Sequence, residues 1–286
     1  MGIFANPLTD LLEYEDFSRD FLKGTDPVGM TGCIDSEKVH FMSTFLGEKK
    51  VQLVVTYNEQ RAREIEEDYK LFCSQVYVIP PRDLIFFSAD LQGNAIIAER
   101  MKAFAALYQN EAKVIITTMD ALMSAAVPFE QLMSHVIKLK EGDELDLEKL
   151  KHDLTVMGYE RVGRVEEPGQ FTVHGGIADV YPLTMEVPVR IELWGDEIDT
   201  IRCFEPQSQR SMDQIECVSV FPAAEVIADD TARRRAVGMI KNELESQLAV
   251  FKKAKEPDKA KRLREETNRI LEALGEDVVL EAPDSY

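Results

Sequence analysis

Paired cysteines, basic excess, long apolar runs and a secretion signal are all missing from this 286-residue chain. The four cysteines and four histidines are scattered without a C-x-x-C pair, whereas zinc ligands usually come in close pairs. No apolar run approaches membrane-spanning length, and the N-terminal sequence MGIFANPLTDLLEYEDF is acidic, without the basic start of a signal peptide. We therefore expect a cytoplasmic protein with reduced cysteines, no metal site and no membrane contact.

Positive charge is also scarce: 52 acidic against 33 basic residues give a net charge of -19. Such a balance repels a phosphate backbone unless the basic residues are segregated. The densest consecutive run is Arg233-Arg234-Arg235, and Glu243 and Glu245 follow it closely. The composition therefore disfavours direct nucleic-acid binding by this chain.

Strand-like and helical patterns alternate in the first part of the chain. The apolar runs 51–57, 76–80 and 113–118 are typical of buried parallel strands. Helical spacing precedes, separates and follows them, with Asn58 as a plausible N-cap. This alternation predicts a doubly wound α/β domain over residues 1–126.

The pattern changes after residue 126. Asp146 is placed to cap a short helix that Gly158 ends, and the runs between 159 and 220 are of β type. They predict a small α+β domain, inserted at residues 127–218. Residues 219–286 are mainly helical and charged, with Leu244, Leu248, Leu263, Ile270 and Leu271 suggesting a helical pair. We expect this last part to pack back on the first domain.

The glycine-punctuated loop before the second helix resembles a damaged phosphate-binding loop. The loop reads G-M-T-G-C-I-D-S, with Gly29, Gly32 and Ser36 in place. A functional P-loop has glycine and lysine where this chain has Ile34 and Asp35. Ile34 would fill the space around the phosphates, and Asp35 would repel them. We therefore expect a degenerate P-loop NTPase-like (RecA/helicase-like) parallel-sheet domain that binds no nucleotide.

Other catalytic constellations are equally absent from the sequence. No acidic Walker B pair follows an apolar strand, and Asp196-Glu197 sits at a predicted hairpin turn. There is no G-x-S-x-G and no H-E-x-x-H motif. The sequence therefore predicts a chain with no catalytic residues and no cofactor.

The run VPVRIELWG combines a buried face with a candidate binding face. Alternation assigns Val187, Val189, Ile191 and Leu193 to the core, and Arg190, Glu192 and Trp194 to the opposite face. Trp194 is the only tryptophan, and Trp and Arg dominate interface hot spots. Alternatively, Trp194 covers a domain boundary or caps a hairpin. In QFTVHGG, His174 alternates with Phe171 and Val173, so it should also face outward.

Three segments carry a resemblance to a known family: 80–93, 158–182 and 187–211. They resemble the N-terminal region of the bacterial transcription-repair coupling factors (Mfd), a region that is similar in turn to the excision-repair protein UvrB. UvrB has an intact P-loop, and an aromatic-rich β-hairpin after its second strand. This chain has neither, because PPRDLIFFSADLQG runs directly into a predicted helix. The chain is therefore more similar to Mfd than to UvrB.

The resemblance implies that the inserted α+β domain binds UvrA. The positions matching the family's contacts are Arg190, Trp194 (usually phenylalanine) and His174 (usually arginine). The histidine lacks the permanent charge of an arginine at neutral pH.

We therefore expect a non-catalytic module that recruits UvrA and links stalled RNA polymerase to nucleotide excision repair. In the family, the rest of the protein is thought to cover this surface, and its other parts, including an ATP-dependent translocase, engage RNA polymerase and DNA. Two alternatives stay open, a UvrB-like DNA-binding module and a regulatory or autoinhibitory structural module.

Overall fold

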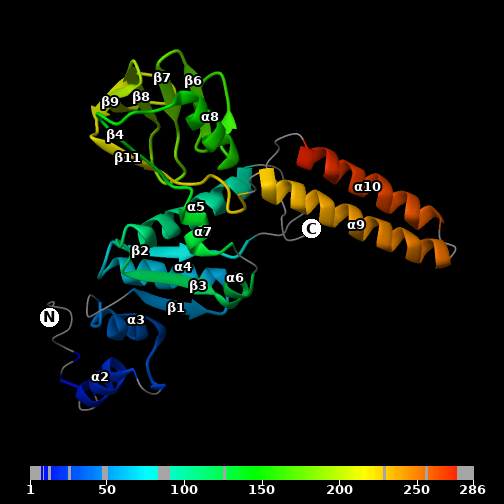
Figure 1. Ribbon diagram of the computed structural model, residues 1–286. Coiled ribbons are helices and arrows are strands. Elements are labelled where there is room, and N and C mark those ends of the chain that lie inside the picture. The colour runs from blue at the N-terminus through cyan, green and yellow to red at the C-terminus, as the bar shows by residue number, and fades with distance from the viewer. Residues whose placement is uncertain are drawn as a thin grey trace. The chain divides into compact units, whose positions relative to one another are not determined.

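The chain divides into two compact units. The computed structural model (Figure 1) describes residues 8, 10–11, 14–24, 27–46, 51–82, 91–124, 127–227, 230–254 and 257–275. The first unit comprises residues 1–83 and 102–124, and the second comprises residues 84–101 and 125–286. Residues 83–90 lie outside the described part, and with them most of the predicted loop 80–93.

The first unit contains a three-stranded parallel sheet with the order β1-β3-β2. Its elements are α2 (Tyr14–Lys23), α3 (Asp35–Ser43), β1 (Gln52–Thr56), α4 (Glu59–Lys70), β2 (Val76–Ile79), the part of α5 (Leu91–Tyr108) from residue 102 onward, β3 (Val114–Thr118) and α6 (Met119–Met123). The Asn58 side chain accepts a hydrogen bond from the Arg61 N–H at 2.8 Å, which confirms the predicted cap of α4. The three expected strands and their parallel pairing confirm the α/β class.

One core cluster of this unit lies between α4 and the sheet, and another includes Ala103 and Ala106 of α5 with Ile115 of β3. The central strand β3 is buried along its whole length. Ala62, Ile65 and Tyr69 of α4 pack in one cluster with Val114 and Ile116. The expectation of a fully buried β1 is wrong, since Leu53 is 59% exposed and Val55 is 41% exposed. An edge strand with one covered face buries only alternate side chains, even when its sequence is apolar throughout.

The second unit carries a six-stranded sheet, in the order β10-β9-β8-β7-β6-β5, and a two-stranded sheet formed by β11 and β4. The β5–β6 pair is parallel, and the other neighbours are antiparallel. The elements other than α5 are α7 (Phe129–Met133), β4 (Ile137–Lys140), α8 (Leu147–Val156), β5 (Glu160–Arg161), β6 (Gln170–His174), β7 (Ile177–Val180), β8 (Val189–Trp194), β9 (Glu197–Phe204), β10 (Ser211–Gln214), β11 (Cys217–Val220), α9 (Asp230–Ala254) and α10 (Pro257–Gly275).

One face of the six-stranded sheet closes over a core with α8. Phe171, Ile191, Ile198 and Ile201 are almost wholly buried there, together with Leu154 of the helix. Asp146 caps α8 as predicted, by accepting hydrogen bonds from the N–H groups of residues 148 and 149 at 2.9 and 3.2 Å.

Gly158 follows α8 with a φ of 89°, and a Cβ at this position would lie 2.6 Å from the Cβ of Ala224. The positive φ and the close approach both require glycine here, which accounts for the predicted end of the helix. The six-stranded sheet together with α8, which we call the β domain, therefore depends on a turn that tolerates no side chain.

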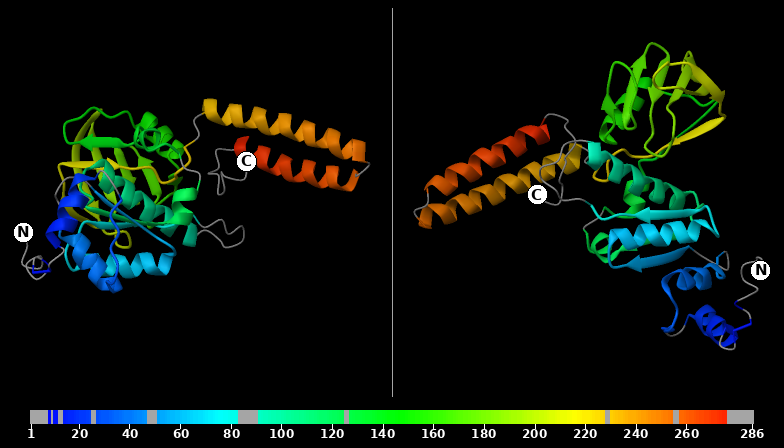
Figure 2. Two further views of the ribbon diagram at one scale, coloured as in Figure 1. Left: turned by 90° about the horizontal axis from the view of Figure 1, so that it is seen from below. Right: turned by 180° about the vertical axis from the view of Figure 1, so that it is seen from behind.

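Helices α9 and α10 run side by side as an antiparallel pair (Figures 1 and 2). Leu244, Leu248 and Phe251 of α9 and Leu263 of α10 are half-buried, while Thr267 is buried among the α10 side chains that the structure describes. The predicted helical pair is confirmed, with Pro257 at the first position of α10, where its missing N–H is tolerated.

The described residues contain no helix long and apolar enough to cross a membrane. All four cysteines are free. Within the same described ranges, no group of His, Cys, Asp and Glu side chains is arranged to hold a metal ion.

Candidate functional site

Two tight hairpins shape the outer face of the six-stranded sheet. Strands β6 and β7 are joined by Gly175-Gly176, and strands β8 and β9 by Gly195-Asp196. Gly175 and Gly195 have φ values of 60° and 67°. Two-residue hairpin turns need such positive values, which glycine adopts without strain.

Strand register arranges the outward residues in rows across the sheet. One row pairs Thr172 with Asp179, Asp179 with Arg190, and Arg190 with Arg202. A second row consists of His174, Ile177, Glu192 and Thr200. Trp194 lies one position beyond the second row, so Glu192 separates it from Arg190 on the same face. The sheet therefore places all three predicted contact residues, Arg190, Trp194 and His174, on one face.

Trp194 is the most exposed large apolar side chain of the chain's described part, at 84%. The neighbouring Leu193 packs against the core, and its N–H donates to the Gly176 carbonyl oxygen at 2.8 Å. This bond holds Trp194 beside the β6–β7 turn, where Ile177 is 41% exposed. The two side chains form an apolar spot at the hairpin end of a sheet that is rigid beneath them.

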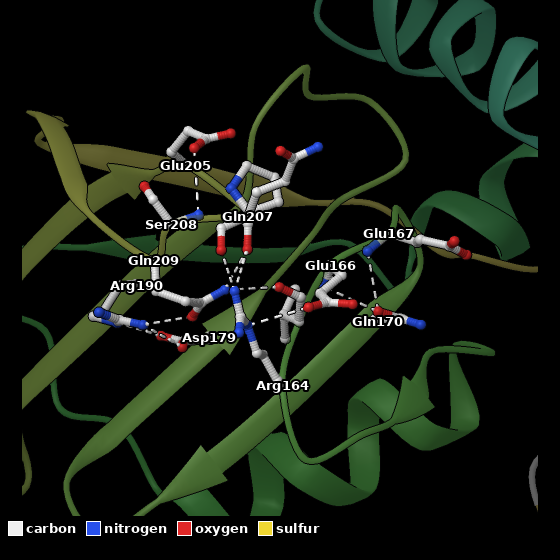
Figure 3. Close-up of polar contacts among 12 residues, drawn as sticks. Arg164, Glu166, Glu167, Gln170, Asp179, Arg190, Glu205, Gln207, Ser208 and Gln209 are labelled. Atoms are coloured by element: carbon white, nitrogen blue, oxygen red, sulfur yellow. Dashed lines mark hydrogen bonds and ion pairs between the residues drawn. The ribbon is translucent and has the colours of Figure 1, made fainter.

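Arg190 is held firmly by neighbours in its own domain (Figure 3). Its Nε and Nη2 donate to the two carboxylate oxygens of Asp179 at 2.7 and 2.8 Å, and Nη2 also lies 3.3 Å from Oε1 of Gln209. The guanidinium carbon lies 4.7 Å from the centre of the Phe204 ring. The hydrogen bond with Asp179 raises the pKa of Arg190 further above its ordinary value. Arg190 is therefore a fixed, permanent cation, with its side chain 20% exposed.

A polar loop that contains Gln207 and Gln209 supports the pairing of Arg190 with Asp179 from one side. Gln209, at a φ of 60°, donates from Nε2 to the carbonyl oxygens of Val165 and Pro206 at 3.1 and 2.7 Å. Arg164 donates to the carbonyl oxygen of Gln207 in the same loop (Figure 3). Beneath the loop, Val165 and Phe204 are buried in a small cluster. The loop thereby fixes the acceptor that orients Arg190.

Arg202 adds an unsatisfied donor to the face. It lies directly across from Arg190 on the neighbouring strand. Its Nε is buried and finds no acceptor among the described residues. The face therefore holds two neighbouring arginines, one paired with Asp179 and the other with a buried donor that is unpaired.

His174 is exposed at the end of β6, so its predicted outward direction is confirmed. It lies in the row of Ile177 and Glu192, two strands away from the strand that bears Arg190 and Trp194. The face therefore extends from His174 to β8, with the apolar side chain of Ile177 between them.

The loop with Gly29 and Gly32 joins α2 to α3, and it does not follow a strand within the described residues. A side chain would find open space at either glycine. Ile34 is 65% exposed, and its N–H donates to Oε2 of Glu37 at 3.1 Å. A carboxylate of the protein thus already occupies the start of α3, where a phosphate would be expected to bind.

Asp35 strengthens this negative character. It accepts a hydrogen bond from Nζ of Lys38 at 3.0 Å and lies 3.5 Å from Nη2 of Arg61. The hydrogen bond from Lys38 and the charge of Arg61 lower the pKa of Asp35. The first turn of α3 therefore begins with a carboxylate that is paired with two cations, next to the carboxylate of Glu37.

Several residues of the sheet face escaped the sequence reasoning. Asp179 and Ile177 share a phase in the run IADV, so alternation within this short strand could have revealed them. Gln209 and Arg202 gave no such signal, because their importance depends on which strand and loop lie next to Arg190.

Comparison with known proteins gives consistent matches. Residues 137–225 match the family model of the UvrB interaction domain. The transcription-repair-coupling factor of Staphylococcus haemolyticus (strain JCSC1435) is 32% identical over 259 residues, which cover 89% of this chain and 21% of the relative. The transcription-repair-coupling factor of Bacillus subtilis (strain 168) is 30% identical over 259 residues, covering 88% of this chain and 22% of the relative. The chain thus spans about a fifth of the length of the curated relatives it matches.

Proposed function

Because this chain belongs with the transcription-repair-coupling factors and contains a UvrB interaction domain, we propose that it is a non-catalytic docking module that recruits UvrA. In this proposal, the outer face of the six-stranded sheet, with Arg190, Trp194 and His174, is the docking surface. The longer protein engages stalled RNA polymerase and DNA through other parts, and its remainder covers the surface until docking is required.

The observation that carries the proposal is Trp194, 84% exposed on a sheet whose opposite face is closely packed. An aromatic side chain on a rigid support loses little conformational entropy when it binds, so it suits an interface anchor. Arg190 supports the same interpretation, because Asp179 fixes its direction in advance. A charged group that is already oriented contributes more affinity than one that must be ordered on binding.

The glycine loop fits a role without nucleotide chemistry. The carboxylates of Asp35 and Glu37 stand at the start of α3, where a nucleotide would place its phosphates. We propose that residues 29–36 are a degenerate nucleotide loop. A thermal-shift experiment with ATP and Mg²⁺ should leave the melting temperature of the chain unchanged, and a saturable rise would overturn this part.

The direct test is calorimetric titration of the chain with UvrA from the same organism. We expect Trp194→Ala to weaken binding by about 2 kcal/mol, or about 30-fold, and Trp194→Phe to restore most of it. Tyr57→Ala is the matched control, because Tyr57 is 76% exposed but lies in the first unit. Equal losses for both alanine variants, or a folded wild-type chain that does not bind, would refute the docking proposal.

Arg190→Ala needs a second variant beside it, because the substitution leaves Asp179 without its partner. Arg190→Lys keeps the charge but loses the two-pronged pairing with the carboxylate. We expect both variants to weaken UvrA binding, alanine more than lysine, while circular dichroism shows that each is folded. Full UvrA binding by Arg190→Ala would show that this residue is not part of the docking surface.

A further inference from the structure

The helical hairpin α9–α10 has a charge opposite to that of the rest of the chain. Residues 230–275 include 12 basic and 8 acidic residues, so the hairpin carries +4 while the remainder carries -23. The densest consecutive basic run, Arg233-Arg234-Arg235, belongs to this same segment. The net charge of the whole chain therefore does not describe this segment, whose charge has the opposite sign.

The positive charge is concentrated at the turn of the hairpin. Residues 252–264 contain seven basic and two acidic residues. Lys252 and Lys253 end α9, and the first turns of α10 carry Lys259, Lys261, Arg262 and Arg264. All six side chains are exposed. Because the two helices are antiparallel neighbours, these two groups meet at one end, which we call the basic tip (Figure 2).

The α10 part of the basic tip is unfavourable for its own helix, whereas Lys252 and Lys253 lie in the last turn of α9, where the helix dipole favours cations. Cations in the first turn of a helix oppose the helix dipole, which favours acids there. Lys259 and Arg262 are three residues apart, as are Lys261 and Arg264, so like charges are neighbours on the helix surface. The ion pair of Lys261 with Glu265 spans 3.9 Å between side chains 77% and 62% exposed, so it neutralises little. A polyanion would relieve this repulsion.

The side chains around the basic tip point to a phosphate backbone as the ligand. The apolar residues there, Leu248, Phe251 and Leu263, are half-buried between the two helices. Val250 is 54% exposed but is a lone aliphatic side chain. A membrane-binding helix needs a continuous apolar face, and protein hot spots usually lie in well-packed patches that contain aromatic side chains. The exposed surface here offers dense positive charge instead, as sequence-independent nucleic-acid binding requires.

We propose that the basic tip binds the phosphate backbone of nucleic acid without reading its sequence. The 25-residue helix α9 rises about 37 Å from its first residue to the tip. This length is several times the Debye length of about 8 Å at physiological salt. Salt therefore screens the basic tip from the acidic residues near the start of α9. Contacts to about five phosphates predict a roughly 500-fold loss of affinity between 50 and 200 mM salt.

The test measures fluorescence anisotropy of a labelled 20-base-pair DNA duplex titrated with the complete chain at 50, 100 and 200 mM salt. The tip variant combines Lys252→Gln, Lys253→Gln, Arg262→Gln and Arg264→Gln. The control variant makes the same change of net charge with Lys23→Gln, Lys70→Gln, Lys140→Gln and Lys149→Gln, at exposed lysines of other elements. Circular dichroism checks that both variants keep their helix content.

We expect wild-type binding that falls steeply with salt, a loss of at least tenfold in the tip variant, and a loss of at most threefold in the control. Equal losses in both variants would show a mere net-charge effect and overturn the proposal. Absence of wild-type binding at 50 mM salt would also overturn it. So would tighter binding to vesicles with an anionic lipid headgroup than to the duplex, because the ligand would then be a membrane.

Discussion

The outer face of the β sheet and the basic tip of the helical hairpin belong to the same unit but present different chemistry. The sheet face has one exposed aromatic side chain, one fixed arginine and several acidic neighbours. The tip has many exposed cations and no exposed aromatic side chain among its described residues. A surface like the sheet face selects a partner by shape and orientation. A surface like the basic tip attracts any polyanion, with an affinity that depends on salt concentration.

The difference in support beneath the two surfaces is equally large. Phe171, Ile191 and Ile201 are 0% exposed under the sheet face. In the described part of the hairpin, Thr267 is buried, and Leu244, Leu248, Phe251 and Leu263 are only half-buried. Precise orientation needs a packed core, while charge density does not, so each surface rests on the support that its chemistry requires.

The largest expected effect is on the sheet core. Phe171→Ala should lower the free energy of unfolding of the β domain by about 3–5 kcal/mol, because it removes a fully buried ring. Amide hydrogen exchange in β6–β9 during urea titration measures this change. Exchange in α9 and α10 should stay unchanged, and a parallel loss in the hairpin would show that the two regions fold as one.

A smaller effect is expected at the ion pair that fixes the sheet face. Arg190→Ala should destabilise the β domain by about 2 kcal/mol, because Asp179 loses a charged partner on a largely buried site. The double variant Arg190→Ala/Asp179→Ala should be more stable than Arg190→Ala alone. Urea denaturation of the two single variants and the double variant measures the coupling, and strictly additive effects would contradict it.

A still smaller effect is expected at alkaline pH, where the β domain should lose stability and the helical hairpin should not. Burial raises the pKa of Tyr159, whose hydroxyl donates to the Phe221 carbonyl oxygen at 2.7 Å. A raised pKa means that the folded state holds the proton more tightly, so stability is complete below about pH 10 and falls as pH rises further.

We therefore expect hydrogen exchange in the β domain to accelerate above pH 10 beyond its intrinsic pH dependence. Tyr159→Phe should show less of this extra acceleration while losing about 1 kcal/mol at neutral pH. Residues 230–275 contain no tyrosine, so the hairpin serves as the internal control. An identical alkaline response in Tyr159→Phe and wild type would refute this assignment.

The smallest expected effect concerns Lys259 in the basic tip, where positive charge favours DNA binding but destabilises α10. Lys259→Glu should stabilise α10 by about 0.5 kcal/mol, because an acid in the first turn suits the helix dipole and pairs with Arg262. The same substitution should weaken binding to the DNA duplex. Hydrogen exchange in α10 and anisotropy measure the two changes, and a fall in both stability and binding would show that Lys259 has a structural role instead.

Local patterns predicted most of the elements because they depend on near neighbours. The capping residues Asn58 and Asp146, the glycine after α8 and the alternation in β8 all acted as the sequence indicated. Strand β10, with the sequence SMDQ, was missed because its four residues are all exposed and show no alternation. Val187 was assigned to the core, but it precedes β8 and is only half-buried.

Properties that depend on the position of an element in a sheet were not predictable in the same way. The apolar run of β1 looks like a buried central strand, and only the order β1-β3-β2 makes it an edge. The outward direction of Arg190 followed from alternation, but its pairing with Asp179 required the register of β7 against β8. Gln209 reaches Arg190 from 19 residues along the chain, a separation that no periodic pattern encodes.

The amino-acid order alone was enough to specify the α/β and α+β organisation, the loss of phosphate-binding residues at Ile34 and Asp35, and the outward phase of Arg190, Trp194 and His174. These features follow from residue chemistry and from periods of two or 3.6 residues, which act over short distances. The tertiary structure decided that Asp179 and Gln209 fix Arg190, that Arg202 keeps an unpaired donor, and that the cations at the end of α9 lie beside those at the start of α10. Such features arise only when strand register and helix pairing bring distant residues together.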